Sequence, residues 1–171
     1  PSGFTVRSEK APNARGVQRA LGGALTYDEW KTRVSKADTV VVTGNYPESW
    51  DTPEISENQT LVLIDTLPNK LTQRADVFIP AATWAEKAGT FENCNNVLQT
   101  FEKAIQPLGD SQPEGQIAMN LQALVGDMET TMFNAATVRR RMADVGIAGM
   151  HEVELPQNTN RIETDMPLSE V

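Results

Sequence analysis

The sequence is poor in the residues that usually bind metals. Cys94 is its only cysteine and His151 its only histidine. One cysteine forms no disulfide framework, no Cys-x-x-Cys zinc site and no cysteine-bound iron–sulfur cluster. One histidine excludes a multi-histidine metal site and leaves a single candidate for any catalytic triad. We therefore expect no metal site, no catalytic residue and no cofactor held by this chain alone.

Positive charge and long apolar runs are also lacking. The formal net charge is −8 and the isoelectric point is about 4.7, which argues against a nucleic-acid partner because phosphate binding needs a concentrated positive surface. No apolar run approaches the roughly 18 residues that span a bilayer, so we expect no direct membrane insertion. Neither a Walker loop nor a Gly-x-Gly-x-x-Gly motif occurs.

The chain also lacks an initiator Met and a signal peptide, and it opens Pro1-Ser2-Gly3-Phe4. We expect it to be part of a longer protein. Its 171 residues suffice for one domain with a core, but not comfortably for two. The hydrophobic pattern predicts one domain over residues 1–146. The acidic stretch 147–171, which holds His151, predicts an extended tail.

Three short apolar runs predict strands at residues 39–43, 61–64 and 77–79. They are continuous rather than alternating, which is typical of parallel strands buried on both faces. The stretch between the first two runs predicts an irregular crossover, and residues 81–101 predict a hairpin or an ordered loop. We expect Trp84 and Phe91 to be at least partly buried and to pin that segment to the domain.

Helical periodicity predicts helices at residues 13–21, 25–36, 111–126 and 130–143. Two of them carry a capping-box spacing, with Thr26 and Glu29 in one and Ser111 and Glu114 in the other. The basic run 139–141 predicts a solvated helix face, because consecutive residues point in different directions. The fold class is therefore α/β, a Rossmann-like parallel sheet flanked by helices, with a hairpin or loop extension and C-terminal helices.

Residues 75–93 read ADVFIPAATWAEKAGTFEN. This segment resembles the signature of the molybdopterin oxidoreductase superfamily, in which a strand "ADVVLP" runs into "E-x-x-GTF-x-N". Residues 61–66 look like the family's preceding "VVxD" strand. Gln99, Phe101, Pro107 and Gly109 fall where the family has its "Q-x-F…P-x-G" stretch.

Two further segments, residues 6–17 and 44–50, look most like the large iron–sulfur subunit of bacterial NADH-quinone oxidoreductases. This resemblance implies a structural and assembly domain of a respiratory complex that passes electrons from NADH to quinone. It also implies iron–sulfur clusters elsewhere in the parent protein, and partner subunits in a membrane-associated complex. The expected location is cytoplasmic, peripheral to the inner membrane.

The sequence departs from the family where a pterin dinucleotide is held. Members with that cofactor usually have "N-x-x-GR-x-Q", whereas Asn96 and Val97 stand here in place of Gly and Arg. Asn tolerates the left-handed backbone of the missing Gly, but Val97 cannot replace an arginine that binds an anion. Gln116 stands near the place of a tryptophan that often opens the next helix.

If a pterin nucleotide is retained, the loops at the strand ends are expected to contact it. The candidate cofactor-binding residues are Gly44, Asn45, Asp65 and Asp76. Two alternatives stay open beside the respiratory-complex hypothesis. In the first, the chain is part of a catalytic molybdopterin-dependent large subunit, of the formate dehydrogenase or nitrate reductase type, with molybdopterin guanine dinucleotide as its cofactor. The other is a non-enzymatic α/β binding module.

Overall fold

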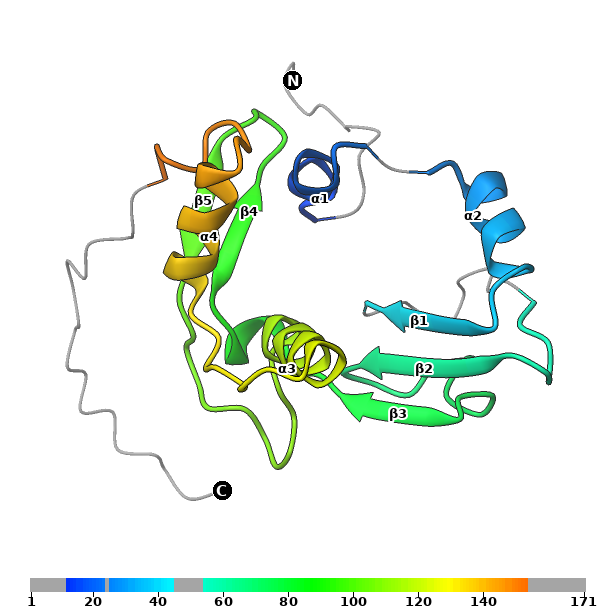
Figure 1. The fold of residues 1–171 in the computed structure, drawn as a ribbon. Helices are drawn as coiled ribbons and strands as arrows, with labels where there is room; N and C mark the ends of the chain where they lie inside the picture. Colours follow the sequence, from blue (N-terminus) through cyan, green and yellow to red (C-terminus); the bar gives the residue numbers. More distant parts are fainter. Residues whose placement is uncertain (1–11, 24, 45–53, 154–171) are drawn as a thin grey trace, which may run out of the picture.

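The α/β fold class is confirmed by a computed structural model, which describes residues 12–23, 25–44 and 54–153. Figure 1 shows α3 lying between a parallel sheet on one side and a hairpin with two helices on the other. The elements in that part of the chain are α1 Ala14–Leu21, α2 Tyr27–Val34, β1 Thr39–Thr43, β2 Thr60–Asp65, β3 Val77–Pro80, the 3₁₀ helix η1 Trp84–Glu86, β4 Gly89–Glu92, β5 Leu98–Phe101, α3 Glu114–Gly126 and α4 Ala135–Asp144.

The sheet has three strands in the order β1-β2-β3, and both pairings are parallel. Val41 lies opposite Val62, and Ile64 opposite Ile79. β2 is therefore the central strand, hydrogen-bonded on both edges. The three predicted strands are confirmed to within one residue at each end.

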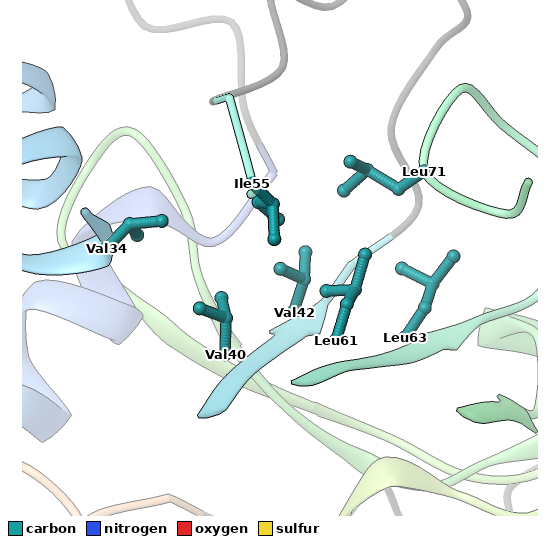
Figure 2. Packing of buried hydrophobic residues seen from close by; sticks show 7 residues of the cluster. All are labelled: Val34, Val40, Val42, Ile55, Leu61, Leu63 and Leu71. Atoms are coloured by element: carbon teal, nitrogen blue, oxygen red, sulfur yellow. The ribbon is translucent and has the colours of Figure 1, made fainter. Parts of the chain in front are cut away.

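One face of the sheet carries the main hydrophobic core. The side chains of β1 and β2 that point to this face meet residues from α2 and from the two crossovers, as Figure 2 shows. The members of this cluster are Val34, Val40, Val42, Ile55, Leu61, Leu63 and Leu71. Leu61 and Leu63 are fully buried, so the centre of the core lies on β2.

The opposite face is covered only in part. There Ile117 of α3 packs with Ile64 and Ala81 at the carboxyl end of β2. The prediction that all three strands are buried on both faces is wrong for β1, whose residues alternate between exposed and buried. It is also wrong for β3, where Val77 and Phe78 are exposed. Val41 is 54% exposed, because the second cluster gathers around the end of β2.

α1 ends where the sequence predicted, whereas α2 is two residues shorter at each end than the predicted range 25–36. The Glu29 amide donates to Thr26 Oγ1, and the Thr26 amide donates to Glu29 Oε2 at 2.8 Å, so the capping box is confirmed. α1 ends at Gly22, whose φ of 67° is a left-handed conformation that glycine adopts at little cost.

The starts of α3 and α4 differ from the prediction. α3 begins after Pro113 with no side-chain cap, because the Ser111 hydroxyl donates to the Leu108 carbonyl at 2.7 Å and the Glu114 carboxylate is bound by Lys87. α4 begins five residues later than expected, since the Asn134 side chain accepts from the Thr137 amide at 2.9 Å and caps the helix there.

The predicted hairpin is confirmed as β4 paired with β5, antiparallel. We expected Trp84 and Phe91 to be at least partly buried. This is wrong for Trp84, which is 74% exposed, whereas Phe91 is 39% exposed. Phe91 contacts Phe101, with ring centroids 4.8 Å apart. The segment is held mainly by buried carboxylates, since Glu86 accepts from the amides of Thr83 at 2.7 Å and Leu108 at 3.0 Å.

A second buried carboxylate ties the hairpin to α1. Arg19 donates from Nε and Nη2 to the two oxygens of Glu92, at 2.6 and 2.5 Å. Arg19 Nη1 also donates to the Ala148 carbonyl at 3.1 Å, and Met150 is buried nearby in sequence. The chain therefore stays packed beyond residue 146. Residues 154–171 lie outside the described residues, so most of the tail prediction is untested.

Leu63→Ala is expected to lower the free energy of unfolding by about 2–5 kcal/mol, because it leaves a cavity at the centre of the core. The matched control is Leu124→Ala on α3, where the leucine is 77% exposed and the expected change is within about 0.5 kcal/mol. Urea denaturation measures both. Equal losses for the two variants would contradict the assignment of the core to β2.

Glu92→Gln is expected to lose stability at neutral pH and to match wild type in acid. The pKa of Glu92 lies below its ordinary value because Arg19 hydrogen-bonds to its carboxylate. The stabilisation is therefore complete above the unfolded-state pKa of about 4.3 and disappears as the pH falls through the lower native value. Melting temperatures from pH 7 to pH 3 measure it. Glu102→Gln, at an exposed position, is the control and should show no such convergence.

Candidate functional site

The carboxyl ends of the three parallel strands meet at one edge of the sheet. Gly44 follows β1 there, with φ at 142°, a backbone conformation that favours glycine. Its amide donates to the Ile64 carbonyl at 3.4 Å, so the end of β1 stays beside β2. In open parallel sheets this edge is where ligands bind.

Asp65 ends β2 and lies almost fully buried at this edge, with 2% exposure. Its Oδ1 accepts from the Thr66 amide, and its Oδ2 accepts from Asn69 Nδ2, both at 2.7 Å. Burial raises the pKa of Asp65, and these hydrogen bonds oppose the rise. The carboxylate therefore fixes the shape of the loop that follows β2.

Thr66 is the residue that sequence reasoning missed at this edge. Its hydroxyl oxygen is buried and makes no well-formed hydrogen bond within the described part of the chain, although it lies close enough to the Asp65 carboxylate to oppose the rise in the pKa of that group. A buried hydroxyl without a partner costs about 1–3 kcal/mol, so such an atom usually has a bridging water or a ligand. The sequence could have indicated Thr66, because it directly follows Asp65, the aspartate of the "VVxD"-like strand.

Asp76 lies at the opposite edge of the sheet, because it precedes β3. Its Oδ2 accepts from the Leu61 amide at 2.8 Å and from Arg74 Nη1 at 2.9 Å. The Leu61 amide, and then Arg74, hold the pKa of Asp76 below its ordinary value. The structure thus brings Gly44 and Asp65 to one edge and separates Asp76 from them. Asn45 lies outside the described residues.

The start of α3 joins the carboxyl edge through the end of β3. The Gln112 amide donates to the Pro80 carbonyl at 3.1 Å, and the Ala82 amide donates to the Gln112 carbonyl at 2.8 Å. A groove of about 800 Å³ runs from here between α3, the base of the hairpin and residues 130–136. This volume lies within the usual range for small-molecule sites.

Side-chain amides line the α3 side of this groove. Gln116 Nε2 donates to Asn120 Oδ1 at 2.8 Å and to the Thr131 carbonyl at 2.9 Å, while Gln116 Oε1 accepts from the Phe133 amide at 2.6 Å. Asn120 Nδ2 also donates to Gln112 Oε1 at 3.2 Å. Gln116, near the place of the family's tryptophan, therefore holds residues 131–133 against α3.

The turn of the hairpin lies away from the sheet, on the other side of α3 (Figure 1). Asn96 has φ at 62°, which confirms that it takes the left-handed conformation expected of the missing glycine. Val97 beside it is exposed. The position of the absent arginine and the carboxyl edge of the sheet are thus on different parts of the molecule.

Metal-binding side chains are sparse in the structure as they are in the sequence. The described residues contain no group of three or more His, Cys, Asp or Glu side chains that could hold a metal ion. His151 is exposed and Cys94 is partly buried. None of the helices in the described ranges is long and apolar enough to cross a membrane.

The chain is similar to segments of known oxidoreductases. A nitrate reductase of Symbiobacterium thermophilum is 34% identical over 70 residues, which are 41% of this chain and 9% of that protein. The alpha subunit of F420-dependent formate dehydrogenase 2 of Methanococcus maripaludis is 37% identical over 76 residues, or 44% of this chain and 11% of that protein. The alpha subunit of an F420-dependent formate dehydrogenase of Methanocaldococcus jannaschii is 38% identical over 66 residues, which are 39% of this chain and 10% of that protein.

This chain therefore spans about a tenth of the length of these relatives. The family model described as Molybdopterin oxidoreductase matches residues 31–123, more than half of the chain. The matched range holds the parallel sheet, the hairpin and most of α3. The chain belongs to the molybdopterin oxidoreductase family.

Proposed function

We propose that this chain is part of the catalytic large subunit of a molybdopterin-dependent oxidoreductase, of the formate dehydrogenase or nitrate reductase type. The observation that carries the proposal is the match to the molybdopterin oxidoreductase family, together with relatives named as formate dehydrogenases and a nitrate reductase. These relatives favour the catalytic alternative over the respiratory-complex hypothesis.

In this proposal the carboxyl edge of the sheet contacts the nucleotide part of molybdopterin guanine dinucleotide. The residues present fit that role in one respect, because the buried Thr66 hydroxyl makes no well-formed hydrogen bond beside the loop that Asp65 holds. Thr66 would hydrogen-bond a polar group of the nucleotide, and Gly44 would allow close approach of the backbone. When bound, the cofactor's molybdenum would supply the redox chemistry, while this chain supplies orientation.

Asp65 has a supporting part in the proposal. Its two oxygens are already engaged by Thr66 and Asn69, and burial leaves it little direct access to a ligand. It therefore acts as a positioning residue for the loop that presents Thr66. The groove along α3 adds a polar wall of amides that suits an extended ligand.

The second candidate is a structural domain of the iron–sulfur subunit of an NADH-quinone oxidoreductase, with partner subunits in a membrane-associated complex. What favours it is Val97, where members that hold the dinucleotide usually have an arginine, although this position lies on a different part of the molecule from the carboxyl edge of the sheet (Figure 1). Without that cation a diphosphate loses a charge-assisted contact. In this case the parent protein holds iron–sulfur clusters and no pterin.

Metal analysis of the protein purified from cells that make it naturally is the test. The catalytic proposal predicts molybdenum or tungsten at about one atom per polypeptide, together with a nucleotide released by acid hydrolysis. Iron in several-fold excess with neither molybdenum nor tungsten would contradict it and support the second candidate. A protein with none of these metals would contradict both.

A further inference from the structure

Arg139 of α4 is buried, although the basic run 139–141 predicted a solvated helix face. Its exposed fraction is 7%, whereas Arg140 and Arg141 are exposed. The prediction is wrong for Arg139 because α4 lies against the hairpin (Figure 1). Nη1 of Arg139 donates to the Thr90 hydroxyl at 3.1 Å.

That single hydrogen bond leaves most N–H groups of the Arg139 guanidinium without an acceptor among the described residues. An arginine has five N–H donors, and Thr90 offers a neutral acceptor for one of them. The carboxylate of Glu92, two residues along β4, is engaged by Arg19. Buried cations are normally paired with an anion, because removing a charge from water is costly. Within the described residues, no ion pair of Arg139 occurs.

Arg139 is also among the residues that line a cavity. It measures about 230 Å³ and lies between α1, the hairpin and α4, which equals the volume of roughly seven or eight water molecules. The polar residues in its lining are Arg139, Thr90 and Asn13. The rest of the lining is apolar and includes Val17, Leu98 and Met142. One buried cation in a mostly apolar wall is complementary to a small amphiphilic anion.

We propose that this cavity binds a small monocarboxylate with a short apolar chain. The carboxylate pairs with Arg139, and the chain contacts the apolar side chains of α1, β5 and α4. An inorganic oxyanion fits less well, because it would set charged oxygens against Leu98 and Met142. The site is separate from the sheet edge and stands independently of the proposed function.

Thermal-shift and calorimetric titration of the 171-residue chain with sodium butyrate tests this. Butyrate should raise the melting temperature at an ionic strength held constant with sodium chloride. Acetate should bind about fifteenfold more weakly, at about fourfold for each missing methylene. Butyramide, which has the same shape without the charge, should not bind measurably.

Arg139→Met should weaken butyrate binding at least about tenfold, while Arg140→Met, on the neighbouring exposed residue, should leave it unchanged. If Arg139→Met does not fold, NMR of the wild type replaces it. Butyrate should then shift the Arg139 Nε–H and Met142 methyl signals and leave the Arg140 Nε–H signal in place. Absence of binding, equal binding of butyrate and butyramide, or shifts confined to other residues would each overturn the proposal.

Discussion

The fold depends on the double pairing of β2. This strand is hydrogen-bonded to β1 on one edge and to β3 on the other, and its leucines form the centre of the main core. Because Ile64 at its end also packs against Ile117 of α3, the same strand positions the helix. Asp65 and Thr66 follow directly, so the packing of β2 determines where the candidate site lies.

Buried charge, rather than aromatic packing, holds the second half of the molecule together. Glu86 satisfies two backbone amides at the base of the hairpin, and Glu92 binds Arg19 of α1. Carboxylates with such partners remain ionised although little water reaches them. Arg139 is the exception in this region. Glu86 and Glu92 are hydrogen-bonded through both carboxylate oxygens, whereas Arg139 donates one hydrogen bond to the Thr90 hydroxyl and lines a cavity.

Local patterns in the sequence predicted the strands, the hairpin and the cap of α2, because each depends on neighbouring residues. They failed where a distant partner decides the outcome. Glu114 looked like half of a capping box, but Lys87 binds it, and Arg139 looked solvated although the hairpin covers it. The strand ends correctly predicted Gly44 and Asp65 at one edge. Asp76 was grouped with them, although a residue that precedes a parallel strand lies at the other edge.

We propose that the carboxyl edge of this sheet contacts the nucleotide of a pterin cofactor, and the cofactor content of a Thr66→Val protein tests this proposal most directly. Valine keeps the volume of the side chain and removes the buried hydroxyl. Thr39→Val, at the amino end of β1, is the matched control. In the naturally produced protein, chromatography of the released nucleotide should show a clear loss per polypeptide for Thr66→Val and none for Thr39→Val. Equal nucleotide content in both variants and wild type would contradict the account.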